Sequence, residues 1–158
     1  MKPFAFLVAL VLGGFISKLY AQLPPLNQKI VDFVKENLGK TVDRGECWDL
    51  VAVPLNKFNA KWDGKFEFGK LLNPNKDAIL PGDIIQFFNV VFEYKKDNTL
   101  YKETMSQHTA IVYKVLQKKE YEIAHQNTSE WGRKVQTSVI NLNNLKVGKI
   151  YFYRPQPQ

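Results

Sequence analysis

The chain has 158 residues, a length typical of one domain, and 45% of them are hydrophobic, enough to form a core. Its 22 Lys and Arg outnumber its 15 Asp and Glu, so the net charge is +7, which favours anionic surfaces such as wall polymers or lipid head groups. The basic residues are spread along the sequence without a stripe of interleaved aromatic residues, and this excludes nucleic acid as the leading partner.

Residues 1–21 have the three-part pattern of a secretory signal peptide. Lys2 supplies a positive start, an apolar run extends over 4–16, and Ala21 is a small residue suited to cleavage. The apolar run is shorter than the roughly 20 residues that a membrane span needs, although an uncleaved anchor is the alternative. We expect a secreted or periplasmic protein that begins near Gln22 and has no stable membrane insertion after cleavage.

A single domain is expected over 22–158, and its first part predicts two helices. Apolar residues recur every four positions over 30–38, Asn27 can cap this helix, and Gly39 ends it. A second helix begins near Cys47, after a turn at 43–46. Two further features complete this part of the chain: Pro54 is expected to kink or shorten the second helix, and residues 59–80 form a polar connection with aromatic anchors.

The second part of the domain predicts strands. A Pro-Gly-Asp turn at 81–83 introduces them, and polar residues break the pattern at 95–98 and at 117–120. Residues 155–158 contain two prolines and read as a short disordered tail. The fold class is therefore α+β, with N-terminal helices packed on a curled antiparallel sheet of about five strands. The strand segments are 84–88, 90–94, 108–116, 121–125, 135–142 and 149–153.

Cys47 is the only cysteine, so it cannot form an internal disulfide. Small secreted domains usually use cysteines in pairs, and a single one indicates a reactive thiol, an intermolecular bond or a buried apolar side chain. At a helix N-terminus the thiol meets free backbone N–H groups and the positive end of the helix dipole. Both favour the thiolate, whose usual pKa is about 8.5, and the Cys47 N–H is a natural donor to an oxyanion.

The two histidines occupy the ends of one predicted hairpin. His108 opens its first strand and His125 closes its second, so the two side chains are expected to be neighbours at one edge of the sheet. An imidazole beside the thiol can form an ion pair with it and later protonate a leaving amine. Such an imidazole needs a third polar group to orient it, and either His125 or Asn127 could serve.

A zinc site is the alternative use of one cysteine and two histidines. No two of these residues have the close spacing of zinc-binding pairs, so we expect no metal and no cofactor.

The motifs around these residues resemble the NlpC-type and CHAP-type papain-like cysteine peptidases. The chain has GECWDL at 45–50, PGDIIQF at 81–87, HTAIV at 108–112 and IAH at 123–125, in the order that both families share. The resemblance extends over 26–154. It departs from the usual Asp-Cys-Ser-Gly of the NlpC type at the nucleophile, and the segment between Phe88 and His108 is long.

The resemblance implies that Cys47 is the nucleophile, His108 the base and His125 the third member, as in the NlpC type. Asn127 in the third role would be closer to the CHAP type. Members of these families mostly hydrolyse amide bonds of peptidoglycan, so the substrate implied is a peptidoglycan stem peptide or another peptide amide.

Two other functions remain open at this stage. An inactive relative could act as a secreted binding module for wall peptide or glycan, presenting Trp48, Trp62 and Trp131. The same three catalytic residues could also transfer an acyl group to an amine instead of water. The oligomeric state is not determined by the sequence.

Overall fold

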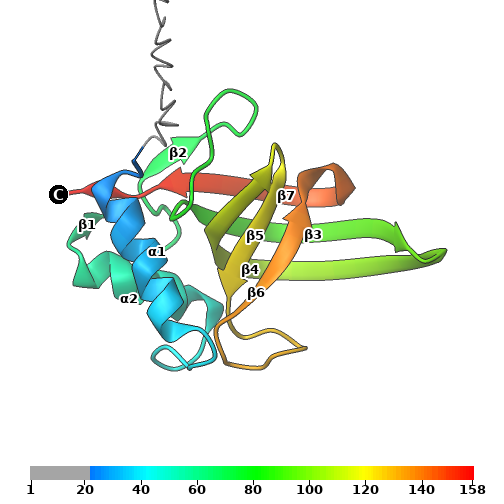
Figure 1. Cartoon of the computed structure of the whole chain (residues 1–158), viewed down its shortest axis with the longest axis horizontal. Helices are drawn as coiled ribbons and strands as arrows, with labels where there is room; N and C mark the ends of the chain where they lie inside the picture. Colours follow the sequence, from blue (N-terminus) through cyan, green and yellow to red (C-terminus); the bar gives the residue numbers. More distant parts are fainter. Residues whose placement is uncertain (1–21) are drawn as a thin grey trace, which may run out of the picture.

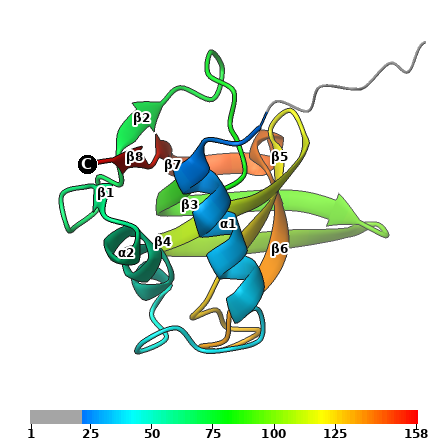
Figure 2. The same ribbon diagram turned by 60° about the vertical axis from the view of Figure 1, so that its left-hand side comes forward.

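Two helices lie on one side of a six-stranded antiparallel sheet in the computed structural model, which describes residues 22–158 (Figure 1). The helices are α1 (Pro25–Asn37) and α2 (Cys47–Lys57), and Figure 2 shows both on the same side of the sheet. The predicted α+β class, with helices packed on a curled antiparallel sheet, is confirmed. The signal peptide predicted over 1–21 lies outside the described residues.

No helix within residues 22–158 is both long and apolar enough to cross a membrane.

Helix α1 forms because its apolar residues share one face, which includes the fully buried Ile30 and Val34. It begins at Pro25, where the missing N–H and the fixed φ of proline suit the first helical position. Asn27 does not cap the helix as expected. It lies inside the first turn, buried, and its side-chain amide donates to Asp83 at 2.9 Å.

Helix α2 begins at Cys47, as predicted. Glu46 is the N-cap residue, and it forms a capping box with Asp49 in which each side chain accepts from the backbone N–H of the other. Arg44 pairs with the buried carboxylate of Asp49 at 2.5 Å, which adds a second hold on the first turn. Pro54 lies inside the helix without ending it, and it is buried.

The sheet has the strand order β2-β7-β3-β4-β5-β6, and all neighbouring strands are antiparallel. A short 3-10 helix, η1 (Leu142–Asn144), connects β6 to β7. The sheet has one strand more than the five expected, because β2 forms within the predicted connection. The strands are β2 (Lys70–Leu72), β3 (Ile84–Lys96), β4 (Thr99–Gln117), β5 (Glu120–His125), β6 (Gln136–Asn141) and β7 (Leu145–Arg154).

The largest difference between the expected and the observed strands lies between Phe88 and His108. Two strands were expected over 84–94, but β3 runs through Asn89, which has a φ of 48°, without ending. Strand β4 likewise begins at Thr99, so His108 lies inside it and does not open it. The outer halves of β3 and β4 form an arm, defined as residues 93–104, which projects from the body of the molecule (Figure 1).

The tip of the arm is a two-residue turn at Asp97 and Asn98. Both residues have a positive φ, of 47° and 63°, which matches the turn type that joins right-twisted antiparallel strands. The polar break predicted at 95–98 is therefore a hairpin turn.

Both faces of the sheet are buried in its centre. Leu50 and Val51 of α2 pack with Ile84 and Ile111 in one cluster. The next residue along each of these strands faces the other way, and a second cluster forms there from Ile85, Phe87, Val112, Ile123 and Phe152. Because side chains of a strand alternate between faces, burial on both explains the nearly continuous apolar runs of β3 and β4.

The expected disordered tail over 155–158 is instead ordered. Its residues Gln156–Pro157 form β8, which pairs with β1 (Ala60–Lys61) in a small two-stranded sheet. Both partners have weak strand sequences, so this pairing depends on the surrounding fold.

Candidate active site

The two histidines contact each other directly on one face of the sheet. His108 Nε2 and His125 Nδ1 are 3.1 Å apart, and Ser138 Oγ lies 3.1 Å from His125 Nε2. Three neighbouring strands, β4, β5 and β6, each contribute one member of this row. The expectation that His108 and His125 are neighbours is met.

The strand register explains why these side chains meet. Ile111 pairs with Ala124, so continuing the register places His125 diagonally across from His108 on the same face. His125 pairs with Gln136, which in turn places Ser138 diagonally across from His125. Two successive diagonal contacts therefore build the row from residues in an ordinary antiparallel ladder.

Burial holds both imidazoles neutral. The pKa of His108 is lowered to about 4, first by loss of solvation and then by the neighbouring His125. Loss of solvation alone lowers the pKa of His125 to about 4. An imidazolium in the resting protein is thus disfavoured at pH 7, which opposes the ion pair expected from the sequence.

Two proton arrangements satisfy the row when both rings are neutral. In the first, His108 Nε2–H donates to His125 Nδ1, and His125 Nε2–H donates to the oxygen of Ser138. This leaves Nδ1 of His108 without a proton and able to act as a base. In the second, every donor and acceptor is exchanged and Nδ1 of His108 carries the proton. Only the first arrangement prepares His108 to accept a proton.

A buried amide fixes the backbone under His108. The side-chain amide of Gln86 on β3 donates to the carbonyl oxygen of His108 at 3.0 Å and accepts from the hydroxyl of Thr109 at 2.8 Å. Gln86 is fully buried, so these bonds are shielded from water. They tie β3 to β4 at the position of the histidine.

Cys47 is half-buried and lies at the start of α2. The hydrogen bonds of Gln126 with Val42 and Glu46, here called the clamp, lie next to it in the sequence. The fully buried amide of Gln126 accepts from the N–H of Val42 and donates to the carbonyl oxygens of Val42 and Glu46, at 3.1, 3.0 and 2.8 Å. Gln126 directly follows His125, and Glu46 directly precedes Cys47. The clamp therefore joins the end of β5 to the N-terminus of α2.

The Glu46 side chain reinforces this clamp. Its carboxylate accepts from the amide of Asn127 at 2.6 Å and pairs with Arg133 at 3.1 Å. Asn127 therefore contacts the loop before the cysteine, and in the described part of the chain its side chain makes no hydrogen bond to His108. Of the two alternatives for a third member, the structure brings His125 to His108 and places Asn127 against Glu46.

No hydrogen bond within residues 22–158 joins the Cys47 thiol to either histidine. Catalytic hydrogen bonds are often long before substrate binds, so this geometry leaves His108 a candidate base. Within the same residues, no group of three or more His, Cys, Asp or Glu side chains is arranged to hold a metal ion.

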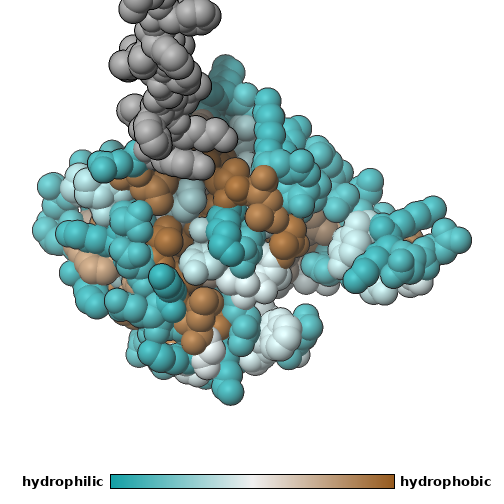
Figure 3. All heavy atoms as spheres, in the orientation of Figure 1, coloured by the Kyte–Doolittle hydropathy of each residue, from teal (hydrophilic) through white to brown (hydrophobic). Residues whose placement is uncertain are grey.

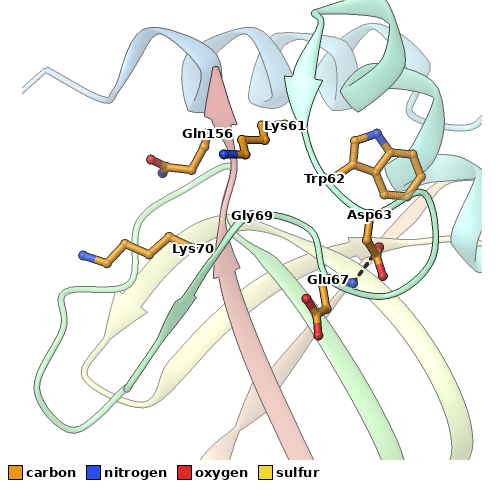
Figure 4. A pocket seen from close by; sticks show the side chains of 7 residues that line it. All are labelled: Lys61, Trp62, Asp63, Glu67, Gly69, Lys70 and Gln156. Atoms are coloured by element: carbon orange, nitrogen blue, oxygen red, sulfur yellow. Dashed lines mark hydrogen bonds between the residues drawn. The ribbon is translucent and has the colours of Figure 1, made fainter. Parts of the chain in front are cut away.

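A cleft of about 590 Å³ opens over the histidine row. His108, His125 and Ser138 line it, and the base of the arm and the loop over 127–131 form its two sides. Cys47 is not among the residues that line it. A second cavity, of about 460 Å³, contains none of the candidate catalytic residues but includes Trp62, one of the three tryptophans considered for a binding module. Figure 4 shows the residues that line it: Lys61, Trp62, Asp63, Glu67, Gly69, Lys70 and Gln156.

Sequence reasoning missed Gln86, Gln126 and Ser138. Gln86 carried a usable signal, since a glutamine in the middle of an apolar strand sequence indicates a buried, hydrogen-bonded amide. Gln126 and Ser138 carried none, because each acts on a partner far away in the sequence.

The chain matches the model of one protein family, described as the AIM3/BBC1 cysteine proteinase-fold domain, over residues 17–158. The comparison with curated proteins gives no match.

Among solved structures, the chain is similar to two crystal structures of Ly7917. The first has 13% sequence identity and a TM-score of 0.52, and the alignment covers 83% of this chain and 62% of that one. The second, of Ly7917 with the hydrolyzing product of MDP, has 12% identity and a TM-score of 0.53, with coverage of 82% and 62%. At this identity the likeness shows a common fold, and the chain spans less than two thirds of the length of Ly7917.

Proposed function

Since the chain belongs to the AIM3/BBC1 cysteine proteinase-fold family, we propose that it is a cysteine amidase or peptidase that uses Cys47, His108 and His125. The observation that carries the proposal is the 3.1 Å contact between His108 Nε2 and His125 Nδ1. This contact lets the ring of His125 orient the ring of His108. His125 ends β5, and the next residue, Gln126, donates a hydrogen bond to Glu46, directly before Cys47 at the start of α2.

The first half of the reaction forms an acyl-enzyme. Nδ1 of neutral His108 accepts the thiol proton of Cys47 while the sulfur attacks the carbonyl carbon of the amide, forming a C–S bond. The backbone N–H of Cys47, at the helix start, stabilises the oxyanion of the tetrahedral intermediate. Collapse of the intermediate breaks the C–N bond, and His108 gives its proton to the departing amine.

The second half of the reaction hydrolyses the thioester. His108 accepts a proton from water as the water oxygen attacks the acyl carbon. The C–S bond then breaks and His108 returns that proton to the sulfur, which releases a carboxylic acid and restores the thiol. His125 holds the ring of His108 throughout, and Ser138 holds His125. Burial of the row keeps both bases neutral until the substrate arrives.

The substrate we propose is a peptide amide of peptidoglycan. Two lines support this class: the resemblance to wall peptidases around Cys47 and His108, and the fold shared with Ly7917, which was crystallised with the hydrolyzing product of MDP. MDP is therefore the first defined substrate to test.

Incubation of residues 22–158 with MDP and with solubilised peptidoglycan, followed by mass analysis of the products, tests the proposal. The wild-type protein is expected to add one water to a peptide amide. Cys47→Ala should abolish product and keep the wild-type circular dichroism spectrum, because the half-buried thiol forms no disulfide and no hydrogen bond with any other residue of 22–158. His108→Ala should also abolish product.

Turnover by Cys47→Ala at the wild-type rate would exclude the mechanism. The product masses also separate hydrolysis from transfer of the acyl group to an amine.

We propose further that the protein is secreted and that the leader over 1–21 is removed. The positive start, the apolar run and Ala21 support this proposal. Expression of the full chain in a secreting host should release a protein whose N-terminal sequencing begins near Gln22. A product that stays in the cells and keeps residues 1–21 would contradict it.

One observation favours a second function, a binding module of the same fold. The cleft is lined by both histidines but not by Cys47. A binding module would retain affinity for peptidoglycan fragments in Cys47→Ser and form no product in the wild type. Measuring binding and product formation with one preparation separates the two functions.

A further inference from the structure

One edge of β4 has no strand partner near the histidine row. Strand β3 pairs with β4 from Thr99 to Ile111, but β5 pairs with it only from Ile111 to Gln117. Within the described part of the chain, residues 99–110 of β4 therefore have a ladder on one side alone. An unpaired edge presents backbone N–H and C=O groups that another extended chain can bind.

This free edge forms a side of the cleft. The residues of β4 that line the cleft are consecutive, from Lys102 to His108. Side chains along a strand alternate between its faces, so a cleft over one face would touch only every second residue. A consecutive run shows that the cleft follows the edge of the strand and reaches its backbone.

The direction of the backbone groups can be assigned close to His108. Val112 uses both its groups on the β3 side, since Gly82 donates to its carbonyl oxygen and its N–H donates to Asp83, each at 2.8 Å. Residues of an antiparallel strand alternate between the two edges. Gln107, five positions earlier, therefore directs its N–H and C=O away from β3 and toward the cleft.

The two sides of the cleft differ in the side chains that they offer to a ligand. The loop over 127–131 faces the edge, and Trp131, 47% exposed, lies on it. The charged groups of the arm side are already engaged, because Glu103 accepts from the hydroxyl of Tyr94 at 2.6 Å and Lys102 lies 3.9 Å from Glu93. On the face that Figure 3 shows, hydrophilic side chains cover most of the outer arm.

We propose that the free edge of β4 over 102–107 binds the peptide part of the substrate as an added strand, and so leads its amide bond to His108. The inference rests on the proposed function, because it takes a peptide as the occupant. Backbone hydrogen bonds supply the affinity, as in other cases of strand addition. Because the cleft is polar, peptides with different side chains are expected to bind. The strand continues directly from this edge into His108, which connects binding to catalysis.

The experiment uses Cys47→Ala protein, residues 22–158, so that binding is measured without cleavage. The probe is a Ser-Ala-Ser-Ala-Ser-Ala-amide peptide with fluorescein on its N-terminal amine, and binding is followed by fluorescence polarisation. The same peptide with every backbone nitrogen methylated cannot donate backbone hydrogen bonds and should lose binding.

A matched pair of variants tests the edge itself. In the Cys47→Ala background, Gln107→Pro removes the N–H that faces the cleft and should weaken binding about tenfold, the worth of one well-made hydrogen bond. Gln107→Ala keeps that N–H and should bind within about twofold of the parent. Equal binding by both variants would overturn the inference.

Hydrogen exchange gives a readout that does not depend on the proline variant folding. Adding the peptide should slow exchange of the Gln107 amide and leave Asp97 and Asn98, at the tip of the arm, unchanged. Unchanged exchange at residues 102–107 when the protein is saturated with peptide would overturn the inference. It would also be overturned if light scattering found a dimer in which residues 102–107 exchange slowly without peptide and the peptide does not bind.

The two proposals fail in different ways. Hydrolysis of MDP by the wild type together with no peptide at the edge would leave the proposed function standing and remove the inference. Peptide bound at the edge together with no product from any substrate would remove the catalytic function and leave the edge as a binding site.

Discussion

At the residue scale, the behaviour of the site depends on the burial of two imidazoles in contact. His108 and His125 are only 7% and 8% exposed, and water cannot stabilise a charge on either ring. In the proposed mechanism, the two neutral rings connected through one hydrogen bond serve as a base and its support. The cost is a dependence of stability on pH, because the unfolded chain is free to protonate both histidines.

The folded protein is therefore expected to lose stability in mild acid. Both histidines titrate near 6.5 when unfolded and at about 4 when folded, so their contribution is complete above pH 6.5 and is lost as the pH falls to 4. The full loss is of the order of 3 kcal/mol for each ring. Urea unfolding between pH 8 and pH 4 measures it.

The double variant His108→Gln, His125→Gln provides the comparison, because it keeps the carboxylates that titrate in the same range. Its free energy of unfolding should fall less steeply than that of the wild type between pH 6.5 and pH 4. Parallel curves would show that the histidines are not buried and neutral.

In the proposed mechanism, Ser138 acts through its contact with His125, so it is expected to be a positioning residue. Ser138→Ala removes the partner of His125 Nε2 and leaves the ring free to choose the wrong tautomer. We expect kcat to fall about tenfold, the cost of one hydrogen bond, with KM little changed. Ser138→Thr, which retains the hydroxyl, should recover most of the rate.

The control for Ser138 is Thr137→Ala, the next residue of β6, whose side chain lies on the opposite face. Its kcat should match the wild type. An equal loss in both variants would indicate a general effect on β6.

At the element scale, the Pro-Gly-Asp turn before β3 anchors the sheet to α1. The buried carboxylate of Asp83 accepts from Asn27 of α1 and from both Nε and Nη2 of Arg154 on β7, at 2.9, 3.0 and 2.8 Å. A motif that marks a family of enzymes thus serves the fold here. Asp83 lies away from the residues that line the histidine cleft.

Gly82 in this turn tests how tightly it is packed. Its φ is 84°, and an added Cβ would lie 2.5 Å from the carbonyl oxygen of Asn27. Gly82→Ala should therefore lower the free energy of unfolding by about 2 to 4 kcal/mol, combining backbone strain with a steric clash.

Gly64→Ala is the matched control, since Gly64 also has a positive φ, 73°, but has no atom within 4 Å of an added Cβ. It should cost about 1 kcal/mol, the backbone strain alone. Thermal or urea unfolding measures both variants. An equal cost in the two would show that the contact with Asn27 gives way easily.

At the scale of the whole molecule, the body and the arm have different tasks. Both buried clusters lie in the body, and none of their fully buried members belongs to residues 93–104. Figure 1 shows the arm extending beyond the rest of the sheet. The arm therefore adds little to the core while bordering the cleft at its base.

Shortening the arm tests whether the arm contributes to the stability of the folded protein. Replacing residues 95–100 by a two-residue Asn-Gly turn places the turn on the Tyr94–Tyr101 pair, which is of the same hydrogen-bonded type as the natural Lys96–Thr99 pair, and keeps the β3 and β4 pairing close to the histidines. We expect an unchanged melting temperature within about 3 °C, because surface segments contribute little. Differential scanning calorimetry measures this, and a large decrease would place part of the core in the arm.

Much of the architecture follows from the sequence alone because it depends on local patterns. Helical spacing, the turn before Cys47 and the glycine turn at 81–83 identify two helices followed by strands. The start of α2 at Cys47 depends on residues within one helical turn, so it was predicted correctly. The end of β5 at His125 was predicted for the same reason.

The tertiary structure alone decided how the candidate residues meet. The clamp joins Gln126 to Val42 across 84 positions of the sequence, and Ser138 reaches His125 through the register of two strands. The ordered tail and the continuous arm likewise depend on partner strands that no local pattern specifies. The sequence by itself identified Cys47, His108 and His125 as candidate residues, and it placed Cys47 at the start of α2 and His125 at the end of β5. Only long-range pairing decided their contacts, because hydrogen bonds and burial arise between segments that are distant along the chain.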